Sequence, residues 1–340
     1  MQHRVMSDFG RELLTFHVSN DYLLISNTPT WSLTAMRLRE KGSERLRASI
    51  RGTVPGVVTS VLAILGIPVV LLLLSQVLSG DTYLDGVIAM VAQWSIFLVA
   101  IAVGLGLAMQ LDGGTLARYG LAIDRRWVVN FVVGFGMGIL VTLVYVSYGV
   151  NRGYFELYPG RIAEFGKIPL GYLLAIIIGI QVFVFLQVVW EELVFRSVML
   201  QNYAEGLVAR GVSPTWSVGA AALGSLLFFG LYHLPTHGPL FWYTIGVGGI
   251  FVVAYLVTGR LDLAIGIHFG RFMEELQGEE IAAFELPALF EITQSSMMGS
   301  LEILAVEFAV SCLLILAWGY LTNGSLGIAS QVYDATDPNN

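Results

Sequence analysis

Three places in the chain carry ionisable side chains inside otherwise apolar segments. Glu191 and Glu192 follow Trp190 near the end of a long apolar run. His233 closes the sequence FGLYH, and His268 lies in GIHFG. Ionisable groups at bilayer depth cost several kcal/mol, so each one is a functional hypothesis by default. Carboxylates and imidazoles are the groups that most often transfer protons in catalysis. Together these residues indicate a polar cluster that performs chemistry inside the membrane.

The two adjacent glutamates differ in the partners that the sequence offers them. Glu192 and Arg196 are four residues apart on one helical face, in the favourable order with the acid first, so they can neutralise each other. Glu191 lies about 100° around the helix from Glu192 and has no such partner. We therefore expect another helix or water to meet its charge. Gln187 precedes it by one turn, which extends the polar stripe and indicates a hydrated crevice.

The depth of these residues can be compared from the turns that join the helices. Glu191 and His233 have their midpoint at residue 212, within the turn sequence GVSP. Equal chain lengths on both sides of a helical hairpin put both residues at one level, each about 30 Å of helix from the turn. They can therefore face each other. His268 fits less well, because its own turn, near Gly259, is much closer along the chain, unless the glycines between 246 and 249 shorten or break the intervening helix.

The composition indicates which elements must position this cluster. Of 340 residues, 56% are hydrophobic and 13% are charged, and the mean hydropathy is +0.73, which excludes a soluble globular protein. We predict an all-α polytopic membrane protein with about eight transmembrane helices and a polar intramembrane site. A net charge of −7, with the 18 basic residues spread along the chain, argues against a nucleic-acid partner. The single cysteine, Cys312, excludes an intrachain disulfide.

The apolar runs and the basic residues together predict a topology. The predicted crossings are 54–79, 87–110, 127–150, 170–190, 215–234, 240–258, 261–274 and 301–321, of which the seventh is short. With the N-terminus inside, the cytoplasmic segments hold 13 Lys or Arg and the external segments hold three. The positive-inside rule therefore predicts an integral membrane protein with both termini in the cytoplasm. In a prokaryote this would be the plasma membrane.

The chain divides into four predicted parts. These are a cytoplasmic N-terminal segment at 1–53, two additional transmembrane helices at 54–110, a helical core at 115–321 that holds the polar cluster, and a disordered acidic tail at 322–340. The basic stretch from Arg37 to Arg51 is interpreted as a topology anchor rather than a specific lipid site. The external stretch after the seventh helix is predicted to be a solvated cap, and its acidic residues, which lack metal-binding spacing, are Glu274, Glu275, Glu279, Glu280, Glu285 and Glu291.

Three motifs occur in order on successive predicted helices. They are EExxxR (Glu191, Glu192, Arg196), FxxxH (Phe229, His233) and a later GxH (His268). This pattern resembles the CPBP family of intramembrane glutamic endopeptidases, which includes type II CAAX prenyl proteases and bacteriocin-processing or immunity relatives. The resemblance makes residues 115–321 a CPBP-like protease core and leaves the N-terminal 110 residues outside it.

The resemblance implies an enzyme that hydrolyses peptide bonds of membrane-anchored peptides or proteins in the lipid bilayer, with prenylated CAAX-type proteins as one substrate class. Glu191 would be the general base that activates water, and His233 and His268 would position that water and stabilise the developing oxyanion. Glu192 and Arg196 would hold the geometry of the site. Phe229 would have a supporting role as part of its motif.

The chain departs from the family pattern at one position. The last motif of the family is commonly HxxxN, but the residue four positions after His268 is Phe272. The amide expected to help hold the water or the oxyanion is therefore missing. Arg271 and Gln277 are the polar residues that could replace it. Phe272 favours the main alternative function, a non-proteolytic scaffold or immunity protein of the same fold.

Zinc chemistry and transport are the remaining alternatives. Two histidines and a glutamate are a known catalytic zinc ligand set, and here the ligands would be Glu191, His233 and His268. The spacing is not the HExxH that presents ligands from one helix, so we expect no cofactor and keep zinc as the runner-up. A secondary transporter would fit the intramembrane charges, but the sequence has no inverted repeat.

Overall fold

The computed structural model describes residues 46–78, 83–159, 162–238, 241–272, 290–292, 297–324 and 326–334. The chain divides into two units, Met1–Arg47 and Ala48–Asn340, and the description below concerns the second. Most of the predicted N-terminal segment, the acidic residues from Glu274 to Glu285 and the end of the C-terminal tail lie outside the described residues.

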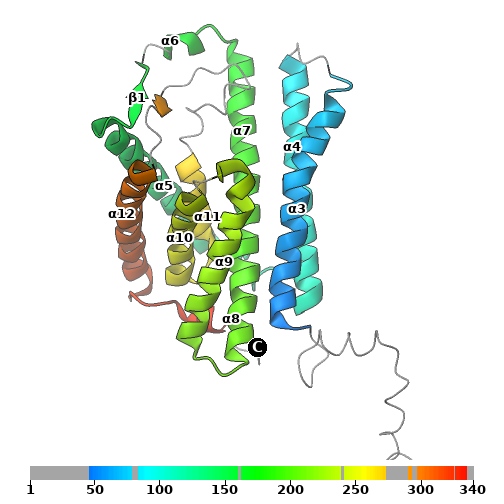
Figure 1. Cartoon of the computed structure of the whole chain (residues 1–340), viewed down its shortest axis with the longest axis vertical. Coiled ribbons are helices and arrows are strands. Elements are labelled where there is room, and N and C mark those ends of the chain that lie inside the picture. The colour runs from blue at the N-terminus through cyan, green and yellow to red at the C-terminus, as the bar shows by residue number, and fades with distance from the viewer. Residues whose placement is uncertain are drawn as a thin grey trace, which may run out of the picture. The chain divides into compact units, whose positions relative to one another are not determined.

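Helices dominate the described part of the chain (Figure 1). The long helices are α3 (Ala48–Leu74), α4 (Tyr83–Asp112), α5 (Arg125–Asn151), α7 (Leu170–Glu191), α9 (Pro214–His237), α10 (Phe241–Thr258) and α12 (Met297–Asn323). A π-helix, η3 (Glu192–Met199), and α8 (Leu200–Val208) continue α7, and the shorter helices are α6 (Ile162–Phe165), α11 (Leu261–Arg271) and α13 (Ser330–Asp334). Two short strands, β1 (Phe155–Leu157) and β2 (Phe290–Ile292), pair antiparallel.

Within the described ranges, seven helices are long and apolar enough to cross a membrane. This confirms the predicted all-α polytopic fold. The predicted seventh crossing corresponds to α11, which has only 11 residues. Its length of about 16 Å is close to half of a hydrocarbon core of about 30 Å. The chain then reaches the far end of the bundle through β2, because β2 pairs with β1 beyond the end of α5.

The additional helices α3 and α4 are joined to the core by buried charges. The Arg51 guanidinium donates to Asp112 on α4 at 3.0 Å and to Glu205 on α8 at 2.7 Å. All three side chains are almost completely buried. Arg118 forms a further ion pair with Glu205 at 3.1 Å. Arg51, the last residue of the predicted basic anchor, is therefore committed to ion pairs inside the protein.

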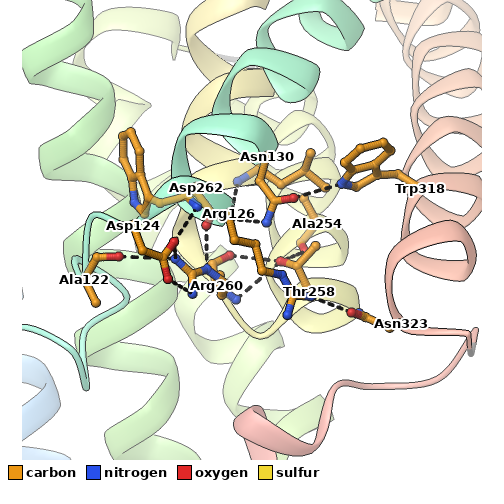
Figure 2. A network of polar contacts seen from close by, with 12 residues as sticks. Ala122, Asp124, Arg126, Asn130, Ala254, Thr258, Arg260, Asp262, Trp318 and Asn323 are labelled. Carbon is orange, nitrogen blue, oxygen red and sulfur yellow. Dashed lines mark hydrogen bonds and ion pairs between the residues drawn. The ribbon is translucent and has the colours of Figure 1, made fainter.

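A second polar network fixes the turn between α10 and α11 (Figure 2). Arg260, in this turn, contacts Asp262 at 2.6 Å and Asp124, the N-cap residue of α5, at 3.0 Å. Asn130 of α5 donates to Asp262 at 3.1 Å and accepts from Trp318 of α12 at 3.1 Å. A hydrogen bond from the backbone N–H of Trp127 and the nearby Arg260 hold the pKa of Asp124 below its ordinary value. The start of α11 is thus tied to α5 and α12.

Candidate active site

The site begins where α7 changes into the π-helix η3. Residues Leu170–Val208 form one helical run of 39 residues, whose two ends are labelled α7 and α8 in Figure 1. Its segment Glu192–Met199 is π-helical. π-Helical turns are rare and frequently occur at functional sites. Every residue of η3 is buried, and Glu191, which precedes it, is also inaccessible to solvent. This change of helix type was not predicted from the sequence.

Glu191 is the point on which the predicted site residues converge. Gln187, one turn earlier, donates to Glu191 Oε1 at 3.0 Å. His233 Nε2 lies 3.7 Å from Oε1, and His268 Nε2 lies 3.7 Å from Oε2. Oε2 accepts no hydrogen bond from the described residues. The polar neighbours of the Glu191 carboxylate therefore come from α7, α9 and α11.

Glu192 has two partners, of which the sequence predicted one. Its Oε2 lies 3.3 Å from Arg196 Nε, in the expected i,i+4 ion pair. Its Oε1 lies 2.7 Å from His268 Nδ1, a contact that joins η3 to α11. Glu192, Arg196 and His268 are all buried. Glu192 thus links the charge of Arg196 to the orientation of the His268 ring.

Phe229 contacts both other motifs through its ring and its backbone. The guanidinium carbon of Arg196 lies 4.2 Å from the centre of the Phe229 ring, which is cation–π geometry. The Phe229 carbonyl lies 2.9 Å from His233 Nδ1, one turn later on α9. Arg196 also donates to the Gly248 carbonyl of α10 at 3.2 Å. These contacts give Phe229 a structural place at the site.

His268 is held between two aromatic rings. Phe251 of α10 stacks on it at 3.9 Å between ring centres, and Phe272 stacks on it at 5.0 Å. The position where the family pattern has asparagine therefore carries a ring that packs on the histidine. Arg271 forms an ion pair with Glu307 of α12 at 3.2 Å and donates to Tyr243 at 2.7 Å. Gln277, the other possible substitute, lies outside the described residues.

His268 lies at the same depth in the helix bundle as Glu191, although the residue count from the turn near Gly259 predicted a different depth. The run Leu170–Val208 is about 58 Å long at about 1.5 Å per residue, well above a hydrocarbon core of about 30 Å. The hairpin that the run α7–η3–α8 forms with α9 therefore has a much longer first arm than the α10–α11 hairpin, whose first helix has 18 residues. The turn near residue 212 and the turn near Gly259 need not lie at the same depth in the membrane. Residue counts from these two turns therefore cannot be compared directly.

Glu191, His233 and His268 are also the side chains that would serve as ligands in a zinc site. Among the described residues, no group of three or more His, Cys, Asp or Glu is arranged to hold a metal ion. Nδ1 of His233 faces a backbone carbonyl and Nδ1 of His268 faces Glu192. A bond from either imidazole to a metal ion would therefore use Nε2. In both histidines, Nε2 lies 3.7 Å from an oxygen of the Glu191 carboxylate.

One comparison with known proteins agrees with the motifs. Residues 173–271 match the family model described as type II CAAX prenyl endopeptidase Rce1-like. This segment contains Glu191, His233 and His268, and it leaves α3, α4, α5 and α12 outside the match. A search of the curated proteins and a search of the solved structures each gave no match. The match confirms the resemblance predicted from the motifs: residues 173–271 are similar to the Rce1-like type II CAAX prenyl endopeptidases.

Proposed function

We propose that the chain is an intramembrane endopeptidase in which Glu191 activates a water molecule for attack on a peptide bond. The observation that carries this proposal is the approach of two histidines, from different helices, to one buried carboxylate at 3.7 Å each. A water molecule hydrogen-bonded to Glu191 could contact both rings, since donor and acceptor atoms in such bonds are about 3 Å apart. Loss of its proton to Glu191 would make it a nucleophile.

The hydrogen bonds at the far side of each ring support distinct roles for the histidines. A carbonyl or carboxylate oxygen only accepts, so the Nδ1 atoms of His233 and His268 carry the protons they share with Phe229 and Glu192. Nε2 of a neutral ring can then accept from the water and hold it beside Glu191. A ring that takes up the water's proton by way of Glu191 becomes a donor at Nε2, stabilises the oxyanion that forms on the peptide carbonyl, and can pass that proton to the leaving amine when the C–N bond breaks.

The substrates proposed are membrane-anchored peptides or proteins, because the site lies among helices that cross the bilayer. The Rce1-like match supports prenylated CAAX-type proteins as one class. Hydrolysis of a library of membrane-anchored peptides, prenylated and unprenylated, by the purified chain in liposomes tests the proposal. Cleavage is expected for at least one class. Folded protein that cleaves none would favour a non-proteolytic member of the family, the alternative that Phe272 supports by replacing the expected amide.

We propose that the reaction needs no metal, and chelation tests this point. In a zinc site, Glu191, His233 and His268 would each lie within about 2.0–2.2 Å of one ion. In the metal-free site the same side chains act through hydrogen bonds. We expect activity to survive prolonged treatment with a strong chelator, and elemental analysis to find far less than one zinc per chain. Stoichiometric zinc that is lost together with activity, and restores it when added back, would contradict this prediction.

We also propose that both termini lie in the cytoplasm, on the basis of the basic residues. The end of the bundle where α3 begins and α12 ends carries Arg51, Arg118, Arg126 and Arg260. Arg210 lies at the same end, because it follows α8, whose Glu205 pairs with Arg51 and Arg118. By the positive-inside rule this end faces the cytoplasm.

Labelling of single cysteines measures this orientation. With Cys312 replaced by serine, a cysteine at exposed position 210 should react with a membrane-impermeant maleimide only in inverted vesicles. A cysteine at exposed position 167, which precedes α7, should react in intact cells. The reverse pattern would contradict the proposed orientation.

A further inference from the structure

The two helices α5 and α11 approach each other backbone to backbone. Each carries two glycines four residues apart, Gly134 and Gly138 on α5 and Gly266 and Gly270 on α11. Small residues at this spacing let helices in membranes pack at very close range. We name these four residues the glycine clasp.

No room exists for a side chain at any position of the glycine clasp. A Cβ atom at Gly134 would lie 2.5 Å from the Leu263 carbonyl oxygen, and one at Gly138 would lie 2.3 Å from the Ile267 carbonyl oxygen. From the other side, a Cβ at Gly266 would lie 2.3 Å from the Phe131 oxygen. A Cβ at Gly270 would lie 2.2 Å from the Phe135 oxygen. All of these neighbours are backbone atoms, so an added methyl group must displace a helix rather than a side chain.

His268 lies opposite the glycine clasp on α11. It is two residues from Gly266 and two from Gly270, and at about 100° per residue its side chain points about 160–200° away from both. On that side it meets Glu192 at 2.7 Å and Glu191 at 3.7 Å. Because α11 lies against α5 at both pairs of clasp glycines and carries His268 on its other face, its distance from α5 sets the distance of His268 from the two carboxylates.

We propose that the glycine clasp positions His268 for the reaction, with its four glycines as positioning residues. This inference rests on the proposed function for its catalytic consequence and on the contacts alone for its structural part. The Cβ atom of an alanine at 138 would lie 2.3 Å from the Ile267 carbonyl oxygen, and an ordinary contact needs about 3.4 Å. The two helices must therefore separate by about 1 Å. That shift pushes His268 toward Glu192, where a 2.7 Å hydrogen bond leaves no space, so the ring must leave its place.

Two variants test the glycine clasp against a third that serves as a matched control. Gly138→Ala and Gly270→Ala should each lower kcat about 100-fold, the loss expected for a misplacement of about 1 Å, with KM changed much less. Both should also shift the pH profile of kcat, which mere loss of folded protein would not do. Gly136→Ala is the control, because Gly136 lies on α5 between two clasp positions with nothing within 4 Å of an added Cβ. Equal kcat and pH profiles for all three variants would overturn the proposal.

A measurement that needs no activity separates this inference from the proposed function. In protein labelled with ¹⁵N-histidine, the signal of His268 can be identified among the five histidines by its loss in His268→Gln. We expect this Nδ1 signal to shift in Gly138→Ala and Gly270→Ala, since the bond to Glu192 is disturbed, and to stay in place in Gly136→Ala. An unchanged signal in both clasp variants would overturn the inference even if the protein proves to be a protease. A shift in a chain without protease activity would support the clasp and contradict only the proposed function.

Discussion

Glu191→Gln is expected to abolish peptide cleavage while the protein stays folded. Glutamine keeps the size of the side chain and keeps an oxygen that can accept the hydrogen bond from Gln187. It removes the carboxylate that takes the proton from water. Loss of a general base typically lowers the rate about 100- to 10,000-fold. Turnover of a membrane-anchored peptide, paired with thermal melting in detergent, measures both effects.

A matched control separates the role of Glu191 from the general effect of removing a carboxylate. Glu156 lies exposed in β1, far along the chain from the site, so Glu156→Gln makes the same chemical change outside the site. We expect this variant to cleave at the wild-type rate. Wild-type turnover by Glu191→Gln, with normal melting, would show that Glu191 is not the base.

Arg196→Ala and Glu192→Ala should each destabilise the protein by about 3–5 kcal/mol. Either change leaves one charge of a buried ion pair without its partner, and such a charge is costly in a medium of low dielectric. The double variant should lose less stability than the sum of the two single losses, because it leaves no stranded charge. Denaturant unfolding of the four proteins in a double-mutant cycle measures this coupling. Additive losses would show that the pair contributes no mutual stabilisation.

Glu192 should differ from Arg196 in its effect on activity. Glu192→Gln removes the charge that pairs with Arg196 but keeps an oxygen that can accept from His268 Nδ1. Glu192→Ala removes both. We therefore expect Glu192→Gln to retain more activity per folded molecule than Glu192→Ala. Equal residual activities would mean that the contact with His268 does not orient the ring.

The all-α membrane fold could be predicted from the sequence because apolar runs are strong signals, and two of the contacts among the intramembrane charges could be predicted from residue spacing. The pair Glu192–Arg196 follows from i,i+4 spacing, and the approach of His233 to Glu191 follows from counting residues to a shared turn. Both inferences use contacts within one helix or one hairpin. Such contacts depend mainly on local geometry, so they can be read from spacing.

Contacts between helices that are distant in sequence could not be predicted in the same way. The bond from His268 to Glu192 joins residues 76 positions apart and depends on how α11 packs against α5. The two Gly-xxx-Gly patterns were a signal for that packing, but the sequence does not say which helices they join. The π-helix η3 was likewise not predicted from the sequence. From its position in a basic stretch, Arg51 was predicted to be a topology anchor. Its buried ion pairs with Asp112 and Glu205 could not be predicted from the sequence.

The role proposed for Glu191 is tested most directly by cleavage in water enriched in ¹⁸O. Purified wild-type protein and Glu191→Gln, in liposomes, are each given a membrane-anchored peptide identified in the library, and mass spectrometry follows the new C-terminal carboxylate. We predict that the wild type forms a product with ¹⁸O in this carboxylate and that Glu191→Gln forms none above background. Equal ¹⁸O-labelled product from both proteins, or no product from folded wild type with any peptide of the library, would contradict a glutamate-activated water in this site.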